Sequence, residues 1–336
     1  GNIGWIAAGL MPKRSWSGLL PVPGTGEFEW TGFRTASELP TSFNPASGFI
    51  ATANNDIRPS GYDMPLNYEF DVAYRAHRIS DVLSAAGAKF TVDDMKRLQH
   101  DDLATAAHIL VPMLVDAATQ RGLREHWVVR ELAGWDAHMA IDARAPLLFQ
   151  AWKKALSNMA LARLAPQAAR ELLGSSWLDD WDNPADALNL LPPAVRDSMM
   201  VDAVDSAVAR LKVDAGADSS AWRWGTLHTA AFPHRIAAAF DLAPVPRGGY
   251  GNTVNATAGA GYSQQYGASY REILDVADWD RSVATSVPGQ SGQPESEHYG
   301  DLLPMWARGE YFPMVFSRAA VVRETQHLLW LRPAGR

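Results

Sequence analysis

The chain has 336 residues, of which 47% are apolar and 20% are charged, a composition typical of a globular protein with one or two large domains. The formal net charge is −7, and no cluster of Lys and Arg alternates with aromatic residues, so we expect no nucleic-acid partner. The sequence contains no cysteine, which excludes disulfides, thiol nucleophiles and thiolate metal sites. The longest apolar run, within 105–116, is too short for a membrane span, so we expect no membrane partner.

Residues 1–70 are rich in Gly, Pro and aromatic residues, which predicts short strands joined by loops. We expect one strand within 1–12 and another in the stretch GFIATANN at 48–55. The second strand should stop at Asn54 and Asn55, because asparagine is a poor strand former. Such a pair can form a polar turn, or it can deliver a neutral amide on a rigid element to a reaction centre.

From residue 71 the spacing of apolar residues changes to that of helices. Thr91 and Asp94 form the pattern of a capping box at the start of one helix. Further helices are expected at 104–121, 123–134, 144–163, 166–173 and 194–212. Pro112 should kink the first of these. The sequence therefore predicts a mainly helical region over 71–221.

The last part of the chain, 222–336, is irregular again. It contains a Gly-rich segment at 248–267, a predicted strand at 270–277 and a loop-rich tail. This order predicts an α+β fold in which 1–70 and 222–336 contribute strands to one sheet, while 71–221 forms a helical insertion.

No complete catalytic set is visible in the residues alone. None of the nine histidines lies in a zinc-like spacing. The acidic groups at 180–183 and 275–280 lack the Gly and Glu of an EF-hand loop, so we interpret them as solvated turns. Ser291 lies in PGQSG, which lacks the strand-to-helix context of a nucleophile turn, and is interpreted as a loop hydroxyl.

Several longer motifs nevertheless occur together in one order. They are GNIGWIAAG at 1–9, LLPVPGTGEFEWTGF at 19–33, FNPASGFIATANN at 43–55, YRAHRI at 74–79, DVADWDRS at 275–282 and the segment 288–318. This combination closely resembles the β subunit of the penicillin acylase family, and the resemblance runs from end to end while thinning in the helical middle. It implies an N-terminal-nucleophile (Ntn) hydrolase with an αββα sandwich. It also implies cleavage of the amide bond of penicillins, acyl-homoserine lactones or related N-acyl small molecules.

In that family, a serine at the N-terminus of the β subunit attacks the amide carbonyl and its own α-amine acts as base. Gly1 is no such serine, and the resemblance assigns this chain to the C-terminal part of the β subunit. We therefore expect the nucleophile on another chain of an autoproteolytically processed precursor, which would also supply the α subunit. The alternatives are a non-catalytic ligand-binding or structural relative with the same fold, and a Trp-lined carbohydrate binder.

The resemblance assigns two catalytic residues to this chain. The first Asn after the family's matching strand, here Asn54, sends its amide into the oxyanion hole, a role that suits a donor that does not titrate. The family's active-site arginine matches Arg75, whose planar, permanently charged fork is expected to orient Asn54 and the amine of the nucleophile. Arg78 is the alternative arginine. Asn55 is expected only to cap the turn.

The chemistry implied by the resemblance requires no cofactor. Family members often carry a structural calcium ion, and we expect most of its ligands on another chain. Glu69 or Asp71 could reach that ion, but the match there is too loose to assign either residue as a ligand. Family members are usually exported, so the resemblance implies a periplasmic protein.

Overall fold

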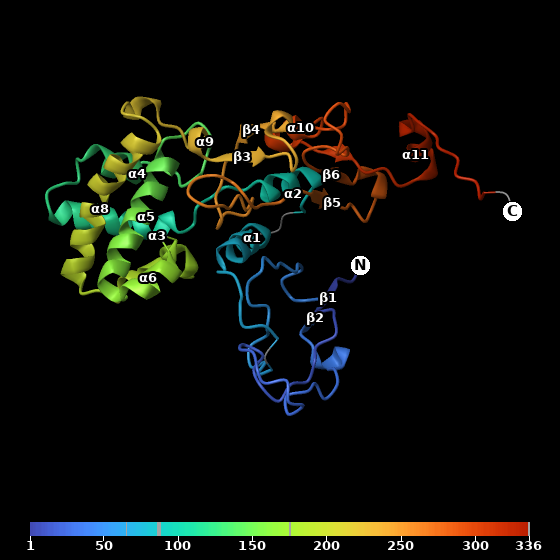
Figure 1. Cartoon of the computed structure of the whole chain (residues 1–336), viewed down its shortest axis with the longest axis horizontal. Coiled ribbons are helices and arrows are strands. Elements are labelled where there is room, and N and C mark those ends of the chain that lie inside the picture. The colour runs from blue at the N-terminus through green and yellow to red at the C-terminus, as the bar shows by residue number, and fades with distance from the viewer. Residues whose placement is uncertain (65, 86–88, 175, 335–336) are drawn as a thin grey trace. The chain divides into compact units, whose positions relative to one another are not determined.

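The structure is a computed structural model that describes residues 1–64, 66–85, 89–174 and 176–334. Short strands lie in the first and last parts of the chain, and most of the helices lie between them (Figure 1), so the predicted α+β composition is confirmed. The chain divides into two compact units. They are Gly1–Gly87 with Ser157–Arg196, and Ala88–Leu156 with Asp197–Arg336.

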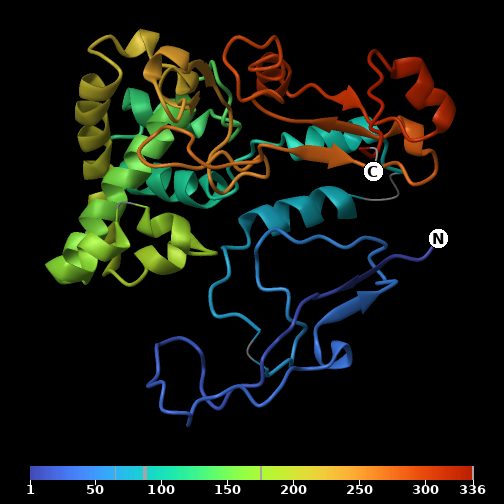
Figure 2. The ribbon, with the colours of Figure 1, turned by 45° about the vertical axis from the view of Figure 1, so that its right-hand side comes forward.

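The first unit begins with a long segment that contains little regular structure (Figure 2). Its elements are β1 (Gly4–Ile6), β2 (Thr41–Phe43), α1 (Tyr74–Ser84), the end of α5 (Ala145–Leu164), α6 (Gln167–Leu173) and α7 (Pro184–Leu188). Strands β1 and β2 pair antiparallel, with Trp5 opposite Ser42. Helix α1 directly follows the Gly- and Pro-rich segment and carries Arg75 and Arg78.

The strand predicted within 48–55 is wrong. Residues 49–53 are irregular, and Asn54 and Asn55 lie in a bend. Phe49 and Ile50 have high strand propensity, but a strand also needs a partner for its backbone donors and acceptors. Among the residues that the structure describes, none pairs with 49–53 in a sheet.

The predicted helices are confirmed, with ends that shift by a few residues. In the second unit they are α2 (Val92–Gln99), α3 (Ala107–Gln120), α4 (Trp127–Ala133), most of α5 and most of α8 (Pro193–Asp214). The short α9 (Trp224–Leu227) also lies in this unit and was not predicted. The capping box of α2 forms as predicted, because Thr91 Oγ1 accepts from Asp94 N and the Asp94 carboxylate accepts from Thr91 N. Pro112 lies inside α3. Among the described helices, none is both long and apolar enough to cross a membrane.

The helices of the second unit enclose an apolar core. Trp152 and Phe149 of α5 are fully buried, and the Trp152 ring nitrogen donates to the carbonyl of Met200 in α8 at 2.8 Å. Leu211, near the end of α8, is also fully buried. The apolar stripe of α8 is therefore part of the core, as the sequence predicts.

The strands of the second unit form two small antiparallel sheets. One contains β3 (Thr229–Phe232) and β4 (Leu242–Pro246), and the other contains β5 (Arg271–Ile273), β6 (Val283–Thr285) and β7 (Phe312–Pro313). Two helices complete this part, α10 (Leu303–Arg308) and α11 (Arg318–Glu324). Trp306 of α10 packs against Ala230 of β3, with Leu242 and Val245 of β4 beside them.

Two sheet predictions need correction. The strand predicted at 270–277 covers only Arg271–Ile273. The first and last parts of the chain do not share a sheet within the described residues, because β1 and β2 pair only with each other. Each of these short strands finds an antiparallel partner within its own compact unit, which satisfies its few ladder hydrogen bonds locally.

Candidate active site

The start of α1 is held by contacts to a segment more than 100 residues away. The hydroxyl of buried Tyr74 donates to the carbonyl of Trp181 at 2.8 Å. The N–H of Ala73 donates to Asp182 Oδ1 at 2.5 Å, and such a carboxylate is favourable at a helix N-terminus. Burial raises the pKa of Tyr74, so its hydroxyl stays a neutral donor. These contacts fix the first turn of α1, where Arg75 lies.

Arg75 and Asn54 are 21 residues apart in the sequence and lie in direct contact. Nη2 of Arg75 donates to Asn54 Oδ1 at 2.9 Å. The same nitrogen donates to Asp71 Oδ2 at 2.6 Å. The Arg75 side chain is 14% exposed and the Asp71 side chain is 45% exposed, so only the arginine side of this ion pair is shielded from solvent.

The contact with Arg75 fixes which end of the Asn54 amide is free. A guanidinium has donors only, so the atom that faces it must be the oxygen Oδ1. The nitrogen Nδ2 then points away as a donor, and in the described part of the chain it donates to no acceptor. Asn54 is an exposed residue. One end of the amide is therefore held while the other end remains available.

The backbone of Asn54 is held as firmly as its side chain. Its φ is 66°, in the left-handed region that asparagine adopts more readily than most residues. Its carbonyl accepts the N–H of Asp71 at 2.9 Å. The turn and the start of α1 are thus joined by both main-chain and side-chain hydrogen bonds.

Asp71 is the residue whose role the sequence analysis missed. Its carboxylate binds the Arg75 guanidinium and its N–H binds the Asn54 carbonyl, so it contacts both predicted site residues. The available signal was an acidic residue four positions before an arginine at the start of a helix, a spacing that favours an ion pair. From the sequence, Asp71 was predicted only as a possible calcium ligand.

Asn55 makes local contacts only. Its Oδ1 accepts from Ala53 N at 3.0 Å, and its Nδ2 donates to the Asp56 carbonyl at 3.0 Å. Both ends of this amide are therefore used within the turn, as in other turns closed by asparagine side chains. The two adjacent amides have different surroundings, although the sequence alone cannot tell them apart.

Arg78, Glu69 and any calcium ligand are the remaining candidates from the sequence. Arg78 lies in α1 one turn after Arg75, but the described hydrogen bond to the Asn54 side chain comes from Arg75. Glu69 is exposed. Among the described residues, no group of three or more His, Asp or Glu side chains is arranged to hold a metal ion. The catalytic roles of Asn54 and Arg75 and any calcium ligand stay predictions.

Comparison with known proteins decides the family. The penicillin amidase family model matches residues 1–323 of the chain. The chain belongs to the penicillin amidase family. This confirms the resemblance on which the site residues were assigned.

Relatives within the family carry two kinds of name. The chain is 30% identical to the penicillin acylase 2 proenzyme of Pseudomonas sp., a match that covers 99% of this chain and 45% of that protein. It is 27% identical to the acyl-homoserine lactone acylase QuiP of Pseudomonas syringae pv. syringae, over 92% of this chain and 42% of that protein. The chain therefore spans less than half the length of these curated relatives.

A solved structure of the family has the same fold. The thermostable penicillin G acylase from Alcaligenes faecalis matches the whole of this chain and 66% of its own chain, with a TM-score of 0.63 and 19% sequence identity. At this identity the likeness concerns the fold alone. It confirms the predicted fold class, part of an Ntn-hydrolase fold.

Proposed function

We propose that this chain is a subunit fragment of an amidohydrolase that cleaves N-acyl amide bonds, either of a penicillin side chain or of an acyl-homoserine lactone. The nucleophile in this proposal is an N-terminal serine on another chain. The observation that carries the proposal is the Asn54 amide, whose oxygen is held by Arg75 and whose nitrogen has no acceptor among the described residues. Membership of the penicillin amidase family supports the same reading.

The proposed reaction has two steps. The serine hydroxyl attacks the carbonyl carbon of the amide, its α-amine takes the proton, and the carbonyl oxygen becomes an oxyanion. Nδ2 of Asn54 donates to that oxyanion from a position that needs little reorganisation. Collapse of the intermediate releases the amine, which takes up the proton, and water then cleaves the acyl-serine ester to release a carboxylic acid and the free serine.

Arg75 has two tasks in this proposal. It holds Asn54 Oδ1, and its positive charge lowers the proton affinity of a nearby terminal amine, which keeps that amine a free base. Its Nε is buried and donates to no acceptor in the described part of the chain.

The proposed partners are the other chains of the same processed precursor, namely an α subunit and the N-terminal part of the β subunit. The word proenzyme in the name of one relative supports a processed precursor. Leu10 and Phe43 in the first unit are 78% and 69% exposed, which supports an interface there. We further propose a periplasmic location, chemistry without a cofactor, and a structural calcium ion held mostly by another chain.

The test uses the assembled protein. Incubation with penicillin G and with acyl-homoserine lactones of several chain lengths should release a free amine and a carboxylic acid from at least one substrate class. The N-terminal residue of the upstream mature chain should be serine. Another residue at that position, with no turnover of either class, would favour the non-catalytic relative.

A substitution of Asp71 tests the contacts around the site. In Asp71→Asn the carboxylate that holds Arg75 becomes a neutral amide, so the guanidinium should lose its charged partner while the fold remains. We expect kcat to fall by roughly 3- to 30-fold with a smaller change in KM, since a misplaced positioning group mainly affects the transition state. Asp63→Asn, a substitution of an exposed acidic residue in the same unit, is the control. Equal kcat values for the two variants would contradict the role of Asp71.

A further inference from the structure

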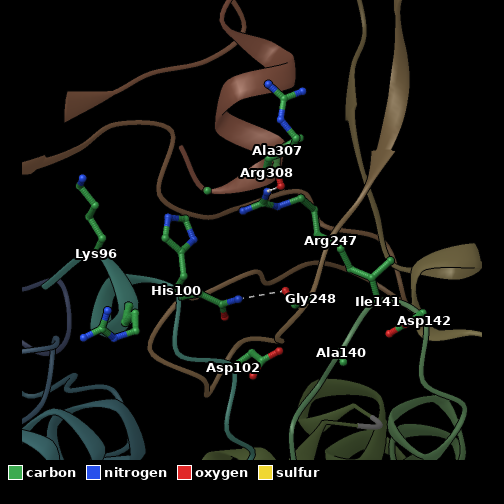
Figure 3. Close-up of a pocket in the computed structure, with 13 residues that line it drawn as sticks. Lys96, His100, Asp102, Ala140, Ile141, Asp142, Arg247, Gly248, Ala307 and Arg308 are labelled. Atoms are coloured by element: carbon green, nitrogen blue, oxygen red, sulfur yellow. Dashed lines mark hydrogen bonds between the residues drawn. The ribbon is translucent and has the colours of Figure 1, made fainter. Parts of the chain in front are cut away.

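A pocket in the second unit contains an arginine, Arg247, with no acidic partner among the described residues. The pocket has a volume of about 480 Å³ and is lined by residues of α2, the loop at 140–142, the end of β4 and the end of α10. Arg247, directly after β4, projects across it toward His100 (Figure 3). None of the predicted catalytic residues lines this pocket.

Arg247 is held firmly on one side. Its Nη1 donates to the carbonyls of Trp306 and Ala307 at 3.1 and 2.7 Å, and its guanidinium lies 4.0 Å from the centroid of the Trp306 ring. The residue is only 4% exposed. Packing of this kind fixes the plane of the guanidinium and so prepares it for a planar ligand.

The other edge of the same guanidinium has no acceptor. In the part of the chain that the structure describes, neither Nε nor Nη2 of Arg247 donates a hydrogen bond, and Nε is buried. Arg247 forms no salt bridge there either. A buried guanidinium without an anion is costly, and Nη2, which unlike Nε is not among its buried unpaired atoms, is the donor that an anion in the pocket can reach.

A second buried arginine, Arg271, acts on Arg247. Buried Arg271 has no acidic partner among the described residues, and it donates only to the carbonyls of Ala268 and Asn255. Burial, and then the charges of Arg271 and Arg247, lower the pKa of His100 to about 4, so the ring is neutral at pH 7. Two buried arginines therefore act on His100, and neither has an acidic partner among the described residues.

The remaining charged groups of the pocket have other partners or are exposed. Three basic residues each pair with an acidic residue, in the ion pairs Lys96–Asp93, Arg97–Asp94 and Arg308–Glu310. Of the two acidic residues in the lining, Asp102 binds His138 Nδ1 at 2.6 Å and Asp142 is exposed. This leaves Arg247 as the buried lining residue with an unused charge.

We propose that this pocket binds a small organic carboxylate, with a carboxylate oxygen on Nη2 of Arg247 and its apolar part against Ala140, Ile141 and Ala307. The volume is that of a small-molecule site, whereas one acidic side chain of a partner would fill only a small part of it. Apolar and basic residues share the lining, which suits an organic acid better than a free inorganic anion.

The test measures binding rather than activity, so it does not depend on the proposed hydrolysis. Sodium butyrate is titrated into the assembled protein at constant ionic strength, and saturation-transfer NMR reports its dissociation constant. Arg247→Met keeps an unbranched apolar side chain beside Trp306 but removes the charge, so we expect binding to weaken about tenfold or more. Arg308→Gln makes the same change of charge in the same pocket at an exposed, paired residue, and should change binding by less than about twofold.

A second variant covers the case in which Arg247→Met fails to fold. Ala140→Leu adds bulk to the lining without changing any charge and should abolish butyrate binding. Three results would overturn the proposal: no saturable binding to the unmodified protein, equal weakening by the variants at Arg247 and Arg308, or tighter binding of inorganic phosphate than of butyrate. The first of these is the result expected if an acidic side chain of another chain already occupies the pocket.

Discussion

In the assembled and processed protein, replacing Asn54 by Ala is expected to lower the rate of acylation by roughly 10²–10³, the usual loss for one side-chain donor to an oxyanion. Substrate affinity should change little, because the donor acts on charge that develops only in the transition state. Single-turnover kinetics on chains already shown to be processed would measure this effect separately from any effect of the substitution on precursor cleavage.

Two further variants distinguish the effect of losing the Asn54 amide from the effect of disturbing the turn that contains it. Asn54→Gly removes the amide but keeps the left-handed backbone accessible, so it should lower the rate as much as Asn54→Ala with less effect on stability. Asn55→Ala removes only local hydrogen bonds and should cost about 0.5–2 kcal/mol of stability with a nearly unchanged rate. If substitutions at the two positions had equal, modest effects on the rate and on stability, the two asparagines would be residues of an ordinary polar turn.

The largest effect on stability is expected in the helical core. Leu211 is fully buried, so Leu211→Ala removes several methyl and methylene groups and leaves a cavity. We expect a loss of about 2–5 kcal/mol in the free energy of unfolding. Chemical denaturation of the assembled protein would measure it. The rate per folded molecule should stay nearly constant, because Leu211 belongs to the second unit whereas Asn54 and Arg75 belong to the first.

Val213, on the same helix, offers a matched control. Its side chain is 77% exposed, so Val213→Ala should change stability by no more than about 0.5 kcal/mol. Similar losses in the free energy of unfolding for the two variants would show that the face of α8 that carries Leu211 is not buried. A large fall in rate for fully folded Leu211→Ala would instead connect the helical region with the chemistry.

The helices could be predicted from the sequence because their signals are local. The capping box of Thr91 and Asp94 lies within one turn, and the stripe that contains Leu211 repeats every few residues along one helix. Strands depend on partners that are distant in sequence. Phe49 and Ile50 therefore predicted a strand from their propensity alone, and the partner strand is absent from the described residues.

In the candidate site, too, the residues with a local sequence signal could be predicted, and the contacts between distant residues could not. Asn54 and Arg75 could be named from motifs, but their contact across 21 residues and the free end of the amide emerge only from the three-dimensional structure. Asp71 was missed because an acidic residue in a loop has many ordinary explanations. Arg247 gave no signal at all, since a sequence does not show which arginine is buried without an acidic partner in the folded chain.

The left-handed conformation of Asn54 has a consequence for reading other sequences of this family. At a φ of 66° only Gly, Asn and Asp are accommodated with little strain. Glycine would keep the turn without a side chain, and aspartate would still accept from Arg75 but present an oxygen where Asn54 presents a donor. A homologue that has lost the chemistry while keeping the fold should therefore be recognisable by Gly or Asp at this position. Glutamine is the chemically nearest substitute, but it should be rare there because the left-handed φ would strain its backbone.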